Sequence, residues 1–181
     1  FVLVAALAAF LLRQGSEGDN QAQATAAPMP SSISVPAFGP QIVSAAELAE
    51  RAASAGYPDG FPLYWAGEVT GTQIELTILT DGTWGVRYLP QGTAAGSPAD
   101  SLTIATFYQP DGAVRVTRIA EQPGAKSMTY STGAIAASES ETSNTISFGF
   151  ESQPVLVVVT SNDPASAWDL LSAGVIAPVN D

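Results

Sequence analysis

Four acidic side chains are the first candidates for chemistry in this sequence. A pair of carboxylates can cleave a glycosidic bond, with one acting as an acid and the other as a base or nucleophile. Asp81 and Asp111 each precede a glycine, which is typical of a turn, and Glu75 is expected to be an exposed strand residue that faces Arg87. We therefore expect no catalytic residue, and a carboxylate-dependent hydrolase is our least favoured hypothesis. The candidates are Glu68, Glu75, Asp81 and Asp111.

The sequence lacks the residues usually found in nucleophilic active sites, metal sites and nucleotide sites. The sequence contains no histidine and no cysteine, which removes the commonest general base and thiolate chemistry. A serine nucleophile would need Lys126 or a carboxylate as its base, and neither Ser-x-x-Lys nor Gly-x-Ser-x-Gly occurs. The stretch from Ser138 to Asn144 is the nearest approach to a calcium loop, but ordinary loops have the same composition. Gly92 and Gly96 are not followed by the Lys-Ser/Thr pair of a phosphate-binding loop, so we expect no nucleotide site. Taken together, these observations lead us to expect no metal and no cofactor.

Six aromatic side chains could instead line an apolar groove for a peptide or a glycan. We expect Trp84 and Tyr88 to be buried in the core. Neighbouring strand residues point to opposite faces, so one member of each adjacent aromatic pair must face outward. The six are Tyr64, Trp65, Trp84, Tyr88, Phe107 and Tyr108.

A β-hairpin over Gln73–Pro90 is the best-specified element that positions these residues. A three-residue loop, Thr80-Asp81-Gly82, pairs Ile78 with Trp84, Leu76 with Val86 and Ile74 with Tyr88. The same register sets Glu75 opposite Arg87 on the other face and puts Gly82 at the left-handed position of a bulge.

The remaining elements follow from caps and hydrophobic patterns. Ser44 and Glu47 form a capping box before a thin, alanine-rich helix that we expect to be a spacer at the domain edge. Asp163 caps a helix that starts at Pro164, while Ala113–Ala120 could be a strand or a helix, of which we prefer the helix. We expect Val155–Thr160 to be a central strand buried on both faces. Further strands are predicted at Phe61–Val69, Leu102–Tyr108, Met128–Ala137 and Thr145–Phe150.

Charge and composition limit the partners. The formal net charge is −11, from 17 acidic and 6 basic residues, so the surface repels phosphate backbones and nucleic acid is not expected to bind. The basic residues are scattered and form no patch. The acidic surface keeps the domain soluble, and attraction of a basic partner or of cations is the alternative function.

The first 43 residues differ in character from the rest. Residues 1–13 begin with the apolar run FVLVAALAAFLL, which we interpret as a truncated transmembrane segment; the alternatives are a cleaved signal peptide and a buried core helix. Residues 14–43 are rich in Ala, Gln, Ser and Pro and are predicted to be a disordered stalk. Residues 44–181 then form one extracytoplasmic domain.

Four phrases in the sequence carry a resemblance. In chain order they are FPLYWAGE at Phe61–Glu68, VRYLPQGTAAG at Val86–Gly96, LTIATFYQPD at Leu102–Asp111 and LLSAGVIAPV at Leu170–Val179. Together they resemble bacterial proteins that combine an N-terminal membrane segment, a low-complexity stalk and one outer domain. The resemblance implies an exported or membrane-anchored location, supports a helix after Asp111 and implies no catalytic residue. With the apolar N-terminal run, we expect a single-pass protein of the cell membrane with its domain on the extracytoplasmic side.

These observations predict an α+β fold, with a mainly antiparallel sheet covered by a few helices. We expect a non-enzymatic domain that binds or positions another envelope protein and is held at the membrane by its N-terminal segment. A binding domain for a small molecule, glycan or peptide is the alternative. An apolar surface spread over a flat face would favour the protein partner, and a deep pocket with convergent polar groups would favour the small ligand.

Overall fold

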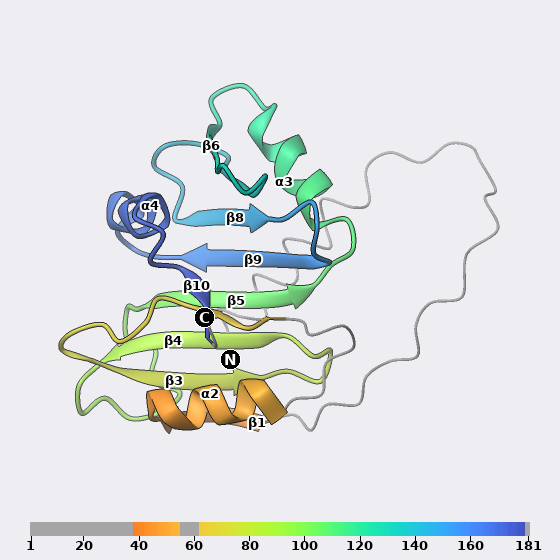
Figure 1. Ribbon diagram of the computed structural model, residues 1–181. Coiled ribbons are helices and arrows are strands. Elements are labelled where there is room, and N and C mark those ends of the chain that lie inside the picture. Colours follow the sequence, from red (N-terminus) through yellow and green to blue (C-terminus); the bar gives the residue numbers. More distant parts are fainter. Residues whose placement is uncertain (1–37, 55–61, 180–181) are drawn as a thin grey trace. The chain divides into compact units, whose positions relative to one another are not determined.

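The computed structural model describes residues 38–54 and 62–179 of the chain (Figure 1). Eight strands form one sheet in the order β1-β3-β4-β5-β9-β8-β7-β6, and every neighbouring pair is antiparallel. The strands are β1 Phe38–Val43, β3 Thr72–Ile78, β4 Trp84–Pro90, β5 Leu102–Tyr108, β6 Lys126–Thr129, β7 Ile135–Ser138, β8 Thr145–Gly149 and β9 Val155–Thr160. The helices are α2 Ala45–Ser54, α3 Gly112–Ala120 and α4 Pro164–Ser172. The predicted α+β class with a mainly antiparallel sheet is confirmed.

One face of the sheet, which we call the core face, carries the main hydrophobic core. The strand registers place alternate residues such as Leu76, Val86, Ile104 and Val157 on this face. All four belong to a single cluster of buried side chains, together with Trp168 of α4. Figure 1 shows α2 at the β1–β3 side of the sheet and α4 at the β8–β9 side. The two helices therefore cover the core face toward opposite edges of the sheet.

A short two-stranded ribbon completes the core-face layer. It pairs β2, Tyr64–Trp65, with β10, Ala177–Pro178. Side chains of the large sheet satisfy its backbone, because Tyr64 N–H donates to the Thr106 hydroxyl and Ala66 N–H donates to the Tyr88 hydroxyl. Burial raises the pKa of Tyr88 to about 12, although the hydrogen bond from Ala66 acts to lower it.

The opposite face, which we call the outer face, has two separate covers. Helix α3 lies over β7, β8 and β9, and it buries Val116 and Ile119 there. The segment 91–101 covers β3 and β4, where Glu75 and Arg87 point outward from the sheet and hold its backbone. We call these regions the helix half and the loop half.

The hairpin prediction is confirmed pair by pair. Ile78 lies opposite Trp84, Leu76 opposite Val86 and Glu75 opposite Arg87. Gly82 has a φ of 82°, the left-handed conformation for which glycine was expected at that position. Strand β9 is buried along Val155–Val159 at the centre of the sheet, as predicted.

The predicted domain boundary at Ser44 is wrong. Strand β1 occupies residues that we assigned to the stalk, and it pairs with β3 through Gln41–Leu76 and Val43–Ile74. Helix α2 lies at the β1–β3 edge of the sheet, as predicted, but the prediction that it is a spacer is wrong, because Leu48 is fully buried in the core cluster (Figure 1). Burying one leucine side chain contributes about 1.5–3 kcal/mol. The capping box itself is present, since Ser44 N–H donates to the Glu47 carboxylate at 2.7 Å.

Three strand predictions differ from the structure in their bounds. Within Phe61–Val69 only Tyr64–Trp65 is a strand, because Gly67 turns the chain with a φ of 65°, and Phe61 lies outside the described residues. The predicted strand Met128–Ala137 is a hairpin, in which residues 130–134 turn the chain between β6 and β7 and Gly133 has a φ of 81°. Strand β8 ends at Gly149, one residue before the predicted end.

The helix predictions at α3 and α4 are confirmed. Residues 112–120 are helical, which settles the ambiguity of Ala113–Ala120 in favour of a helix. Asp163 caps α4 by accepting a hydrogen bond from Ser166 N–H at 3.2 Å, and Pro164 is the first helical residue. The predicted membrane segment and residues 14–37 of the predicted stalk lie outside the described residues. Among the helices at positions 38–54 and 62–179, none combines the length and apolarity needed to span a membrane.

Candidate functional site

Several connections meet at one end of the sheet. The registers of β4, β5 and β9 bring together the β3–β4 turn, the β5–α3 connection and the β8–β9 turn. Gln109 N–H donates to the Pro154 carbonyl at 2.7 Å and joins the last two of these connections. This end therefore gathers loop residues from distant parts of the sequence, which is a common setting for a binding site.

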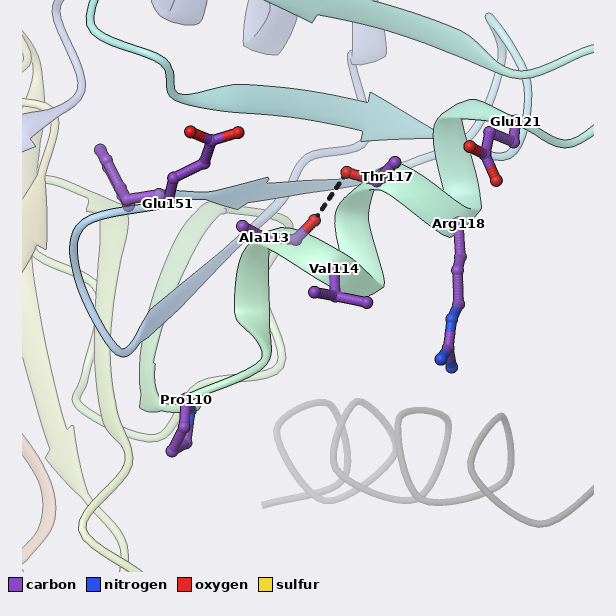
Figure 2. A pocket seen from close by; sticks show the side chains of 8 residues that line it. Pro110, Ala113, Val114, Thr117, Arg118, Glu121 and Glu151 are labelled. Atoms are coloured by element: carbon purple, nitrogen blue, oxygen red, sulfur yellow. Dashed lines mark hydrogen bonds between the residues drawn. The ribbon is translucent and has the colours of Figure 1, made fainter. Parts of the chain in front are cut away.

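An open groove with a volume of about 480 Å³ lies here beside α3 (Figure 2). Its walls come from α3, from Pro110 before the helix, and from Phe150 and Glu151 in the β8–β9 turn. Val114 is 53% exposed, the most exposed large hydrophobic side chain among the described residues. The groove is lined by Pro110, Ala113, Val114, Thr117, Arg118, Glu121, Phe150 and Glu151.

Two glycines set the position of α3 on the sheet. A Cβ atom on Gly112 would lie 2.5 Å from the Val155 carbonyl oxygen, and one on Gly149 would lie 3.0 Å from the Ala113 backbone. Both distances are shorter than a van der Waals contact, so only glycine permits this approach of helix and strands. The close packing buries Val116 and leaves Val114 and Arg118, one turn apart, at the groove.

The groove contains few groups that could react. The Thr117 hydroxyl donates to the Ala113 carbonyl at 2.9 Å, shown by the dashed line in Figure 2, and so is engaged within the helix. The charged side chains that line the groove are Arg118, Glu121 and Glu151. The groove therefore combines apolar side chains with charged ones in about equal share.

The four candidate carboxylates do not form one site. Glu75 is only 1% exposed, so its prediction as an exposed residue is wrong. It pairs with Arg87 at 2.6 Å and accepts a hydrogen bond from Gly96 N–H under the segment 91–101. Asp81 accepts a hydrogen bond from Thr83 N–H at 2.9 Å within the β3–β4 turn, and Glu68 is exposed before β3.

Asp111 stands directly before α3, next to the groove. It accepts hydrogen bonds from the Gln109 amide and from Arg115 Nε, the latter at 3.0 Å. Partial burial acts to raise the pKa of Asp111, but these hydrogen bonds and the Arg115 charge outweigh it and lower the pKa below its usual value. The carboxylate is thus held ionised by one neighbour from α3, Arg115, and one from the connection before it, Gln109.

The stretch Ser138–Asn144 uses its hydroxyl groups internally. The Ser138 hydroxyl donates to the Ser140 carbonyl at 2.8 Å, and the Ser143 hydroxyl donates to the Thr145 carbonyl at 3.1 Å. Across the described part of the chain, no three acidic side chains come together as metal ligands would. The stretch therefore shows the geometry of an ordinary loop.

The aromatic residues gather differently from the sequence prediction. Trp84 and Tyr88 are buried in the core, as predicted, and within the pair Tyr64–Trp65 it is Tyr64 that is buried. Tyr64 stacks on Phe150 with ring centroids 5.0 Å apart, and Phe150 contacts Phe148 at 4.5 Å. Tyr130 joins this cluster, and burial raises its pKa to about 12.

Phe150 is the groove residue that the aromatic candidates omitted. It was assigned to the end of a strand. The alternation of side chains along a strand does not show that Phe150 belongs to a turn and that its ring packs at the edge of the core. The available signal was its position at the end of the predicted strand, next to Glu151 and the short connection to the following predicted strand. Comparison of the chain with protein-family models, curated proteins and solved structures finds no match, so the site is interpreted from its own geometry.

Proposed function

We propose that this chain is a non-enzymatic binding domain, held at the cell membrane by its apolar N-terminal segment, that docks another envelope protein in the groove beside α3. The exposure of Val114, at 53%, is the observation that carries the proposal. An apolar side chain in this position loses contact with water when a partner covers it, which favours association.

The chemistry of the described residues supports binding over catalysis. Glu75 and Asp111 are engaged with Arg87 and Arg115, and Asp81 is engaged with the backbone of its own turn. The groove is open on one side, whereas a site for a small ligand usually encloses most of the ligand surface. A partner protein is therefore the favoured occupant.

Site-specific photo-crosslinking in intact membranes tests this function. A photoreactive residue replaces Val114 in the full-length protein, and the matched control replaces Val175, an exposed valine (39%) outside the groove. We expect one discrete adduct with another protein from position 114 and none from position 175. Equal adducts from both positions, no adduct, or adducts that contain only this chain would contradict the proposal.

A further inference from the structure

One cation differs from the other basic side chains in the described part of the chain. Arg87 pairs with Glu75, and Arg115 pairs with Asp111. Arg51 donates to the Gln41 side chain and lies 5.7 Å from the Phe38 ring centroid, and Lys126 lies 4.9 Å from that of Trp168. Within residues 38–54 and 62–179, Arg118 alone among the basic side chains makes no hydrogen bond, ion pair or ring contact.

The position of this free cation matters in so acidic a protein. Acidic residues outnumber basic ones by 17 to 6, yet Arg118 is exposed at the groove without a carboxylate partner. In Figure 2 its side chain extends to the side of α3 on which Pro110 lies, whereas the Glu151 carboxylate points the other way. The guanidinium therefore faces an approaching ligand from the same side as the apolar wall.

Val114 and Arg118 are four residues apart on α3, so their Cβ atoms are about 6 Å apart. In an extended peptide, side chains at positions i and i+2 point the same way and lie about 6.6 Å apart. The spacing of Val114 and Arg118 is close to the spacing of side chains i and i+2. One extended segment can therefore place one side chain against Val114 and the other against Arg118. An apolar side chain would contact Val114 and Pro110, and a carboxylate would reach Arg118.

Resting on the proposed function, we infer that the partner enters the groove as an extended segment in which an apolar residue and an acidic residue are separated by one position. A guanidinium binds a carboxylate through two parallel hydrogen bonds, so Arg118 complements aspartate or glutamate. The net charge of −11 repels a run of acidic residues, which limits the segment to one carboxylate near the groove.

Blocked pentapeptides provide the test, titrated into the full-length protein and followed by NMR. The probe is acetyl-Ala-Phe-Ala-Asp-Ala-amide, and its controls carry Asn in place of Asp or place Phe and Asp side by side. We expect the probe to shift the Val114 and Arg118 resonances and to bind roughly threefold more tightly than either control, as an exposed ion pair allows. In R118Q the advantage of Asp over Asn should disappear, whereas the matched groove variant E121Q should retain it.

Absence of binding, equal affinity for the Asp and Asn peptides, or an unchanged preference in R118Q would overturn the inference. A lysine version of the probe that binds more tightly than the aspartate version would also overturn it, and would point to Glu121 or Glu151 as the recognising groups. The crosslink from position 114 does not depend on these peptides. A crosslink without an aspartate preference would therefore reject the recognition chemistry and leave the proposed function standing, whereas loss of both would reject both.

Discussion

The helix half and the loop half of the outer face are covered by opposite means. Over β7, β8 and β9, α3 packs through apolar side chains and close backbone contact at Gly112 and Gly149. Over β3 and β4, the segment 91–101 has no helix or strand and is held by the ion pair Glu75–Arg87. The same sheet thus shows one cover fixed by shape and another fixed by charge.

The ion pair acts as a hub for the loop half. Arg87 donates to the carbonyl oxygens of Ser97 and Ala99 at 3.0 and 3.2 Å, and to the Ser101 hydroxyl at 3.2 Å. Glu75 accepts from Gly96 N–H, so both partners bind the segment as well as each other. A buried charge is tolerable only while it is paired, which makes the loop half more sensitive to the loss of one side chain.

The largest expected effect is therefore in the loop half. Arg87→Met leaves the Glu75 carboxylate buried without its partner, and we expect it to lower the free energy of unfolding by about 3–5 kcal/mol. Urea denaturation measures the loss, and limited proteolysis should show new cleavage within residues 91–101. A stability within about 1 kcal/mol of the parent would contradict the role given to the pair.

The double variant Glu75→Leu with Arg87→Met separates the ion pair from the cover that it holds. Replacing both charges with apolar side chains can be neutral or stabilising, so much of the lost stability should return. The hydrogen bonds to Ser97 and Ala99 remain absent, and cleavage within residues 91–101 should persist. Recovery of both properties would show that the segment does not need these bonds.

The helix half should respond to volume rather than to charge. Gly112→Ala puts a methyl group 2.5 Å from the Val155 carbonyl oxygen, so α3 or β9 must shift. We expect a loss of about 1–3 kcal/mol, which is usual for overpacking, and altered NMR resonances along the groove. Gly39→Ala is the matched control, because nothing lies within 4 Å of its added Cβ. Equal effects of the two substitutions would contradict the close packing of α3.

Features set by residues close together in the chain follow from the sequence, and features set by long-range packing do not. The Asp81-Gly82 turn, the Ser44–Glu47 capping box and the Asp163 cap depend on residues close together in the chain, and local patterns identify them. The cross-strand pairing of Glu75 with Arg87 followed from the hairpin register. The burial of this pair did not follow from the register. It depends on the segment 91–101, which covers the sheet there and has no periodic pattern in its sequence.

Long-range pairing explains the other errors. Strand β1 contains Gly39 and Pro40 and follows a stretch rich in Ala, Ser and Pro, so only its pairing with β3 identifies it as part of the sheet. The β6–β7 turn was hidden because Met128, Tyr130 and Ala134 continue an apolar pattern through it. The groove was not predicted, since it requires the helix and the β8–β9 turn to meet in space.

The smallest expected effect comes from the exposed ion pair at the start of α3. Arg115→Gln removes the partner of Asp111, but close packing positions the helix, so we expect a loss of about 0.5 kcal/mol or less near neutral pH. The folded state lowers the pKa of Asp111, so its contribution to stability is present above the unfolded pKa and is lost as pH falls through the folded value.

The difference in the free energy of unfolding between the parent and Arg115→Gln should therefore shrink in acid. Urea denaturation near neutral pH and at acidic pH would measure this change. Asp111→Asn should produce a similar small loss, and the double variant should lose little more than either single one, because both remove the same interaction. If Arg115→Gln instead destabilised the protein as much as Arg87→Met, charge would position α3 as well. The contrast between the two halves of the outer face would then fail.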